Sequence, residues 1–416
     1  MNATTRRPLH LLYEGSVKKV WKAPEHSQRL WFEFTDDYSV FDWGKMPDTI
    51  ANKGRALAVI GTYLFQRIGE ASFWRDLPNS PHLKRFDQAW LKARFSHSIY
   101  SGQNGLRDNG APHHFTKLVK EDGSEAPLAF GGTSKDPVFM EVFEAAVHRP
   151  TLEKIMHQTL FVYPQLNDLS KTRLIPLEIV FRFGMPSGSS LTERLAKTPE
   201  YAQELGVEIP GPGKFFAHPV LEFYTKLEPK DRLLSWQEAV VLSGLSGQPF
   251  EDLIELALDT ALALYVIFAE RKIELWDGKV EMVAQDSHPI LADSIGPDEL
   301  RLLYEDCHLS KEMIRQVYRG TQWETQLKEA QKIAKADNSR SWKEVAVNDL
   351  KIAPEPLTPA AKQVIDQLYG VLANHLVGEQ IFEKHPPLDR FIKELPPEFK
   401  GEKKFVAAAQ RKEGKS

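Results

Sequence analysis

The sequence predicts an α+β protein with a small β-rich N-terminal lobe, a larger C-terminal lobe and a C-terminal appendage. Three observations support this prediction. Runs of β-branched and aromatic residues occupy much of the first hundred residues, and apolar residues recur at helical spacing over 53–68 and 251–269. The composition becomes polar after about residue 334. A length of 416 residues predicts two or three domains.

The composition excludes several classes of protein. With 42% hydrophobic and 26% charged residues, the chain is not disordered, collagen-like or a disulfide scaffold. Lys and Arg total 53 against 57 Asp and Glu, a formal charge of −4, so no basic excess predicts binding to nucleic acid or to an anionic membrane. The one cysteine, Cys307, cannot form an internal disulfide or a thiolate zinc site, which favours a reducing compartment.

Neither a signal peptide nor a membrane-spanning segment is predicted. The N-terminal fifteen residues contain two arginines but no apolar stretch of signal-peptide length. The most apolar run, Ala261–Ala269, is far shorter than the ~20 residues that cross a bilayer, and its periodicity indicates a buried helix. We therefore expect a cytoplasmic protein.

The N-terminal lobe is expected to span residues 1–110. Leu12–Lys22 and Arg29–Thr35 are predicted as strands, because both are rich in β-branched and aromatic residues and a turn signal at 24–27 separates them. Lys53–Ile68 is predicted as a helix from apolar residues at helical spacing. The polar, glycine-bearing segment Gly102–Gly132 is predicted as a loop or a connection between lobes.

The larger lobe is expected over 111–335 and the appendage over 336–416. Leu174–Phe183 is predicted as a buried strand, and the helix Glu251–Ala269 precedes a strand pair at Ile273–Ala284 and Ile290–Ile295. In the appendage, Ala360–Leu376 is predicted as an amphipathic helix that docks on another part of the protein. The last sixteen residues resemble a solvated tail.

The predicted strand pair carries an unusual set of charges. Alternate residues of a strand share a face, so Asp277, Lys279 and Glu281 should point the same way. The second strand ends in Asp293, and pairing of the two strands would bring this carboxylate toward Glu281. Two carboxylates suit Mg²⁺ that carries nucleotide phosphates. A solvated strand face with cross-strand charge pairs is the alternative interpretation, and spacing alone leaves both open.

Several ordered motifs over about 300 residues make the chain resemble the SAICAR synthetase family. The family's D-x-K-x-E strand, its later A/G-D-E segment and its P-D-x-x-R segment correspond to Asp277–Glu281, Ala292–Ser294 and Pro297–Arg301. The remaining blocks correspond to Leu12–Trp21, Asp36–Asp42, Lys53-Gly54, Pro176–Arg182 with Ser187–Ser189, and Leu309–Arg315. Each block alone is a weak signal, whereas their order and number together are specific.

The resemblance implies a two-lobed fold with ATP in the cleft, a helical C-terminal extension, and a ligase reaction. In that reaction ATP activates the carboxylate of carboxyaminoimidazole ribotide as an acyl phosphate, and the amine of L-aspartate opens it, a step of de novo purine biosynthesis. ATP and Mg²⁺ are the implied cofactors, and a homo-oligomer is possible. The alternatives are a related ATP-dependent ligase with another carboxylate or amine, and a non-catalytic nucleotide-binding homologue.

The resemblance also implies roles for individual residues. Lys279, Lys18 and Asp277 would be catalytic, with Lys18 neutralising phosphate charge and Lys279 contacting the reacting oxygens. Glu281 and Asp293 would hold the metal. The nucleotide would be bound by Gly15, Lys18, Glu178, Lys226, Glu281 and Asp293, and the substrates by Asp42, Lys53, Arg182, Ser189, Asp298 and Arg301. Other interpretations are an ordinary solvated lysine at Lys18 and a loop without a site at His113-His114.

The chain departs from the family pattern at four places, one of which is Glu299-Leu300 near Arg301, where the family has a small or polar pair. Ser16 stands where the family has a lysine, and Ser294 stands where it has an acid beside the metal carboxylate. The block after Arg182, Phe183–Pro186, lacks a second arginine and is one residue longer. These departures affect substrate contacts more than the expected metal carboxylates, so they favour retained ATP chemistry over a firm assignment of the acceptor. Arg182 lies in an apolar run, where a buried guanidinium requires a carboxylate or an anionic ligand.

Overall fold

Segments that are far apart in the sequence combine into two units in the computed structural model, which describes residues 9–24, 26, 28–133, 136–164, 172–186, 188–336 and 341–400. Of the described residues, the first unit comprises those within Met1–Ile60, Lys117–Glu141 and Glu305–Lys404, and the second those within Gly61–Thr116 and Val142–Tyr304. The predicted divisions at residues 110 and 335 follow the chain in order, whereas these units interleave, because sheets take strands from distant segments. The predicted tail, 401–416, lies outside the described residues.

A five-stranded sheet forms the β-rich part of the N-terminal region, with the strand order β1-β2-β3-β5-β4. Its strands are β1 (His10–Glu14), β2 (Lys18–Lys22), β3 (Arg29–Phe34), β4 (Phe115–Lys120) and β5 (Val138–Phe143). The stretch Leu12–Lys22, predicted as one strand, is therefore two, because the chain reverses where the Gly15 N–H donates to the Lys18 carbonyl at 2.8 Å. The prediction of a loop over Gly102–Gly132 is wrong where β4 joins the sheet.

Helices α1 (Lys53–Gly69) and α14 (Pro359–Val377) match the two predictions made for those segments. In the first unit α14 docks on the chain that follows β3: the Ala51 N–H donates to Asp366 at 2.8 Å, and the Lys362 ammonium donates to the Thr49 carbonyl at 2.5 Å. The other helices after residue 305 are α11 (Lys311–Tyr318), α12 (Gln322–Ala336), α13 (Trp342–Glu344) with the π-helical turn Val345–Asp349, α15 (Leu388–Glu394) and the 3₁₀ turn Pro397–Phe399.

The second unit contains the larger sheet, in which neighbouring strands run in the order β11-β10-β9-β12-β14, and β13 and β8 pair with β12. These are β8 (Arg173–Leu174), β9 (Leu177–Gly184), β10 (Phe215–Thr225), β11 (Leu233–Leu234), β12 (Glu274–Gln285), β13 (His288–Ala292) and β14 (Leu300–Tyr304); a short β15 (Cys307–His308) follows them. Pro176 separates β8 from β9, so the predicted strand Leu174–Phe183 is interrupted near its start.

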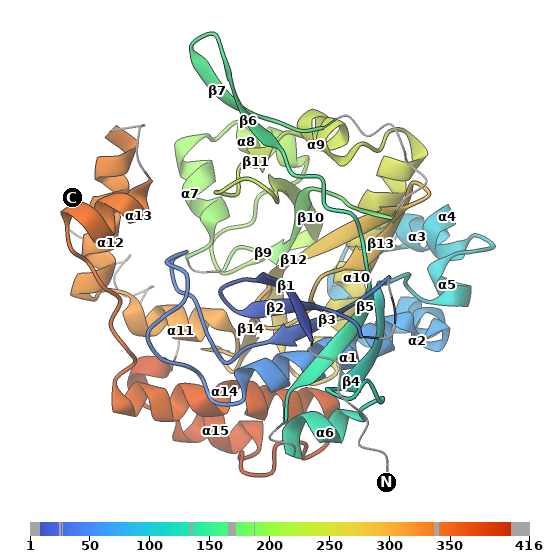
Figure 1. The fold of residues 1–416 in the computed structure, drawn as a ribbon. Helices are drawn as coiled ribbons and strands as arrows, with labels where there is room; N and C mark the ends of the chain where they lie inside the picture. The colour runs from blue at the N-terminus through green and yellow to red at the C-terminus, as the bar shows by residue number, and fades with distance from the viewer. Residues whose placement is uncertain are drawn as a thin grey trace. The chain divides into compact units, whose positions relative to one another are not determined.

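The long helix α10 (Gln248–Ala269) packs on β9 and β12 with its apolar side (Figure 1). The other described helices of the same unit are α2 (Ala71–Asp76), α3 (Gln88–Ser96), α4 (Ser98–Ser101), α5 (Leu106–Asn109), α7 (Ser190–Lys197), α8 (Tyr201–Leu205), α9 (Trp236–Ser243) and the 3₁₀ turns Leu77–Asn79 and Pro81–Arg85. A further helix, α6 (Leu128–Thr133), lies in the first unit. Together, sheets and helices agree with the predicted α+β class.

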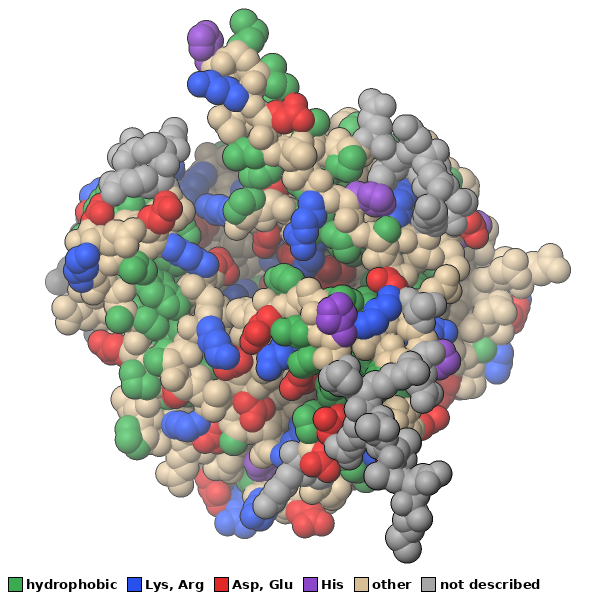
Figure 2. All heavy atoms as spheres, in the orientation of Figure 1, with side chains coloured by type: hydrophobic (Ala, Val, Ile, Leu, Met, Phe, Trp, Pro, Cys, Tyr) green, Lys and Arg blue, Asp and Glu red, His purple; other side chains and the backbone are tan. Residues whose placement is uncertain are grey.

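The hairpin of β6 (Thr151–Ile155) and β7 (Gln158–Val162) extends away from the larger sheet (Figure 1). Its apolar residues Leu152, Met156 and Leu160 are exposed, and Figure 2 shows green side chains at its tip next to a purple one. Elsewhere on that face positive and negative side chains are interspersed, in keeping with the small net charge. No described helix combines the length and apolar character needed to cross a membrane.

Candidate active site

The central strand β12 presents Asp277, Lys279 and Glu281 on one face, as their alternation predicted. Val280 and Met282, which alternate with them, are 2% and 0% exposed, so the opposite face belongs to the core. Asp277 and Glu281 are themselves only 8% and 5% exposed. Because buried carboxylates require compensating charges or donors, the interpretation as a solvated strand face does not fit this burial.

Two lysines supply these compensating charges on one side of the strand. The Lys279 Nζ donates to Glu178 Oε1 at 2.6 Å, and the Lys226 Nζ donates to the same oxygen at 3.2 Å and to Glu281 Oε1 at 2.5 Å. Glu178 lies on β9, between β10 and β12, and Lys226 directly follows β10. Three neighbouring strands therefore assemble a lysine–carboxylate cluster from residues 48 to 101 positions apart in their contacts.

Electrostatics keep both lysines charged. Burial opposes the charged form of Lys226, but Glu281, Asp293 and Glu178 outweigh it and raise the pKa of this lysine. Burial likewise acts against Lys279, and Glu178 with Glu281 raises its pKa. For Glu178 burial alone would raise the pKa, but the two ammonium groups lower it. The cluster thus holds two permanent cations beside an ionised carboxylate.

The predicted approach of Glu281 and Asp293 rests on pairing of β12 with β13, and the two strands do pair. Glu281 lies opposite Ala292, and Asp293 follows with a left-handed backbone at φ +61°. Burial and the negative charge of Asp293 raise the pKa of Glu281 to about 7. The described residues contain no group of three or more His, Cys, Asp or Glu side chains arranged to hold a metal. Two carboxylates that repel each other nevertheless fit Mg²⁺, which takes one or two protein carboxylates and completes its octahedron with phosphate and water.

Guanidinium groups surround the other end of this β12 face. Arg182 on β9 donates from Nε to Glu222 at 2.5 Å, from Nη1 to Asp277 at 3.2 Å and from Nη2 to Ser190 Oγ at 3.2 Å. Arg301 on β14 approaches the other oxygen of Asp277 at 3.4 Å. The buried arginine that the sequence singled out therefore has carboxylate partners. Burial acts against its charge, but Glu222 and Asp277 raise its pKa.

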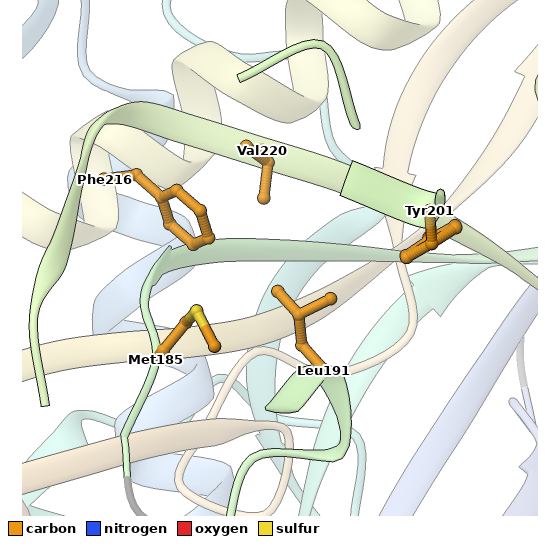
Figure 3. Close-up of a cluster of buried hydrophobic side chains, with 5 residues drawn as sticks. All are labelled: Met185, Leu191, Tyr201, Phe216 and Val220. Atoms are coloured by element: carbon orange, nitrogen blue, oxygen red, sulfur yellow. The ribbon is translucent and has the colours of Figure 1, made fainter. Parts of the chain in front are cut away.

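Helix α7 is hydrogen-bonded to the buried ion pair of Arg182 and Glu222. Ser189 caps the helix by accepting from the Leu191 N–H, and Arg194 in its last turn donates to Glu222 and, at 2.5 Å, to the Tyr224 hydroxyl. An apolar cluster of Met185, Leu191, Tyr201, Phe216 and Val220 packs α7 and α8 against β10 (Figure 3). The Tyr201 hydroxyl also donates to Glu222 at 2.8 Å.

Sequence reasoning did not identify Glu222, Arg194 or His114. Glu222 is a lone acid in the apolar strand β10 and is 2% exposed, and an isolated charge in such a run was the available signal. His114, taken for part of a loop without a site, is 4% exposed and its Nε2 donates to the Asp293 carbonyl at 2.9 Å. His114 lies outside helices and strands, as predicted, but the chain beside β13 makes it a core residue.

Four of the predicted site residues belong to the first unit, and their roles stay predictions. Gly15 lies in the turn between β1 and β2, and the Lys18 ammonium lies 4.4 Å from the centre of the Phe32 ring. Asp42 is exposed and adopts φ +58°. Lys53 is 1% exposed, with its ammonium 5.4 Å from the centre of the Tyr369 ring of α14.

The remaining predicted residues lie in the second unit. Asp298 is half-buried in the turn before β14. Ser294, which stands where the family has an acid, donates to Glu299 Oε1 at 3.2 Å, so Glu299 supplies a carboxylate near that position. Ser189 is 1% exposed, and the adjoining Ser187 lies outside the described residues.

Comparisons with known proteins agree with the sequence motifs. The sequence model of the SAICAR synthetase family matches residues 11–84 and 106–355. An Archaeoglobus fulgidus protein provisionally named phosphoribosylaminoimidazole-succinocarboxamide synthase is 28% identical over 389 residues, which are 92% of this chain and 98% of the relative. A Thermoplasma acidophilum protein with that name is 28% identical over 89% of this chain and 100% of its own length.

One solved structure, titled SAICAR synthase, matches with a TM-score of 0.51 at 15% identity, covering 91% of this chain and 98% of its own; it supports the fold alone. The match of the family model covers well over half of the chain and includes the lysine–carboxylate cluster on β9, β10 and β12. The predicted family, fold class and ligase class are therefore confirmed. This chain belongs to the SAICAR synthetase family.

Proposed function

We propose that this chain joins L-aspartate to carboxyaminoimidazole ribotide, with conversion of ATP to ADP and phosphate, in purine biosynthesis. The observation that carries the proposal is the lysine–carboxylate cluster of Glu178, Lys226, Lys279 and Glu281, within the region matched by the family model. A carboxylate becomes an acylating agent when its oxygen attacks the γ-phosphate. Phosphoryl transfer of this kind depends mainly on positioning and on neutralisation of charge.

Lys226 and Lys279 are suited to the neutralisation. Both stay protonated because carboxylates raise their pKa values, and Lys226 is a quarter exposed and Lys279 about a third exposed at their side chains. Each ammonium can exchange its carboxylate partner for a phosphate oxygen without losing a proton. We infer that Lys279 contacts the reacting oxygens and that Lys226 contacts the nucleotide. Gly15 and Lys18 are further nucleotide-binding residues in this proposal.

Glu281 and Asp293 are the residues that would hold Mg²⁺. When bound there, the ion would supply charge neutralisation at the phosphates of ATP. The protein's part is to place two carboxylates at the end of a paired strand. Burial first, and the negative charge of Asp293 second, raise the pKa of Glu281.

Arg182, Arg301, Ser189 and Asp298 form the substrate side of the proposal, together with Asp42 and Lys53. Arg301 is suited to an anionic group of the ribotide, because its guanidinium group can bind such a group through two N–H donors and its side chain, 3.4 Å from Asp277, is 14% exposed. Arg182 has three protein partners and is 5% exposed, so it holds Asp277 and Ser190 in place. A cytoplasmic location and a homo-oligomer belong to this proposal as expectations.

The test is ADP release with Mg²⁺-ATP, the ribotide and L-aspartate, omitting each substrate in turn. We expect release only when all three are present, and its loss in Glu281→Gln. Glu274→Gln is the matched control, since Glu274 lies on the same strand but is exposed and accepts from Trp276. Turnover with another acceptor alone would instead indicate a related ligase. Nucleotide binding without any turnover would indicate a non-catalytic homologue.

A further inference from the structure

Asp293 has an unusual backbone for a residue whose carboxylate must be placed accurately. Its φ of +61° lies in the left-handed region, which non-glycine residues seldom adopt, although Asp tolerates it better than most. A left-handed residue persists where the surrounding structure fixes the peptide groups on both sides of it. Two groups do this for Asp293, one on each side of the residue.

The sheet fixes the N-terminal side. Ala292 lies opposite Glu281 in the β12–β13 ladder, and one residue earlier Leu291 donates its N–H to the Pro112 carbonyl at 2.9 Å. The Leu291 carbonyl in turn accepts from the His114 N–H at 2.8 Å. The segment Pro112–His114 thus runs along β13 up to the point where that strand ends.

The side chain of His114 fixes the C-terminal side. Its Nε2 lies 2.9 Å from the Asp293 carbonyl oxygen, and because a carbonyl only accepts, Nε2 carries the proton. The ring is 4% exposed and packs edge-on against Phe143 at 6.0 Å and beside Phe65 at 5.8 Å. The Phe143 N–H donates to the His114 carbonyl at 3.1 Å, so the main chain and the ring of this histidine are both held.

We propose that His114 is a positioning residue for the metal carboxylate: its Nε2–H holds the Asp293 peptide in the left-handed conformation that directs the carboxylate toward Glu281. This inference rests on the proposed function, because it assumes that Glu281 and Asp293 hold a divalent cation. His114 itself does not contact the cation. It acts through the backbone: the β12–β13 ladder fixes the peptide group before Asp293, and His114 fixes the peptide group after it.

The experiment uses Mn²⁺ with ADP as the probe and the full chain, and it follows Mn²⁺ affinity by water-proton relaxation, so the readout is binding. Two substitutions distinguish the loss of the hydrogen-bond donor from the loss of the imidazole ring. In His114→Gln the amide nitrogen occupies about the position of Nε2 and keeps the donor, whereas the shorter side chain of His114→Asn cannot reach the Asp293 carbonyl. His113→Asn is the matched control, because His113 contacts the Phe115 carbonyl through Nδ1, at 3.1 Å, and asparagine reproduces that position.

We expect His114→Asn to weaken Mn²⁺ binding by about 10- to 100-fold, the usual effect of removing a group that orients a ligand. His114→Gln and His113→Asn should bind near the wild-type affinity, and the thermal midpoints of His114→Gln and His114→Asn should be similar. Wild-type affinity in His114→Asn, or equal loss in both His114 variants, would overturn the role of the donor. Absence of binding by the wild type would refute the metal site and the inference together, while ADP release with ribotide and aspartate tests the ligase function separately.

Discussion

Replacing Glu222 by glutamine should destabilise the second unit strongly, because this carboxylate lies between two guanidinium groups. Its side chain is fully buried and accepts from Arg182 at 2.5 Å, from Arg194, and from the Tyr201 hydroxyl at 2.8 Å. Glutamine keeps the shape but removes the charge and turns an amide N–H₂ toward a guanidinium group, which only donates. Arg182 and Arg194 would then repel each other without a shared counter-ion.

The magnitude follows from the partners that remain. Removing one member of a buried ion pair costs about 3–5 kcal/mol, since the other charge is left uncompensated. Arg182 keeps Asp277 at 3.2 Å and Ser190 at 3.2 Å, and Arg194 is 19% exposed, so the loss should lie near the lower limit, about 3 kcal/mol. For a unit of this size, each kcal/mol lowers the thermal midpoint by about 2–4 °C, which gives a decrease of roughly 6–12 °C.

Differential scanning calorimetry of the full chain measures this decrease. Glu394→Gln is the control: Glu394 pairs with Arg390 at 2.8 Å, but both side chains are more than half exposed, and such pairs contribute at most about 1 kcal/mol. Adding Arg194→Met to Glu222→Gln should restore part of the midpoint, because one of the uncompensated cations is removed. A decrease below about 2 °C, or no recovery in the double variant, would refute the argument that Glu222 neutralises both arginines.

Three further predictions follow from other parts of the chain. Arg301→Ala should raise the KM for the ribotide by about 10- to 100-fold, the loss expected for charged hydrogen bonds, and leave the KM for ATP nearly unchanged. If steady-state kinetics showed equal increases in the two KM values, Arg301 would not be a ribotide-binding residue. Burial raises the pKa of Asp259 from its ordinary 3.8 to about 7, despite its contact with Arg94, so between these values the folded protein binds a proton that the unfolded chain releases. The free energy of unfolding should therefore fall as the pH rises from about 4 to about 7. Glu281, whose pKa is also raised to about 7, adds to that slope, so urea titrations of Asp259→Asn should show a smaller slope; an unchanged slope contradicts the assignment. Ser16→Lys, at an exposed turn position, should lower the KM for ATP if phosphates lie near β1 and β2, and an unchanged KM would show that another cation supplies this charge.

Local patterns in the sequence were sufficient to predict much of the site. The alternation of Asp277, Lys279 and Glu281 identified one face of β12, because side chains of a strand alternate by geometry. Pairing of that strand with the segment ending at Asp293 followed from their closeness along the chain. The helical spacing over 53–68 and 251–269 predicted α1 and α10 to within a few residues.

Other features depended on which segments become neighbours. Leu12–Lys22 divides into β1 and β2 because a turn at Gly15 reverses the chain, a choice that propensity does not reveal. Phe115–Lys120 looked like a loop, and it is a strand because β5 offers it a hydrogen-bonding edge. Propensity over a short polar segment is a weak guide when the tertiary structure supplies a partner.

The sequence by itself determined the residue types of the site, the strand faces that carry them and the family to which the chain belongs. Only the tertiary structure decided the partners: Glu222 between Arg182 and Arg194, Lys226 on Glu178 and Glu281, and His114 on the Asp293 carbonyl. The physical reason is that alternation fixes the direction of a side chain within its own strand. The partner that the side chain meets depends on sheet order and register, which arise from contacts between segments distant in the sequence.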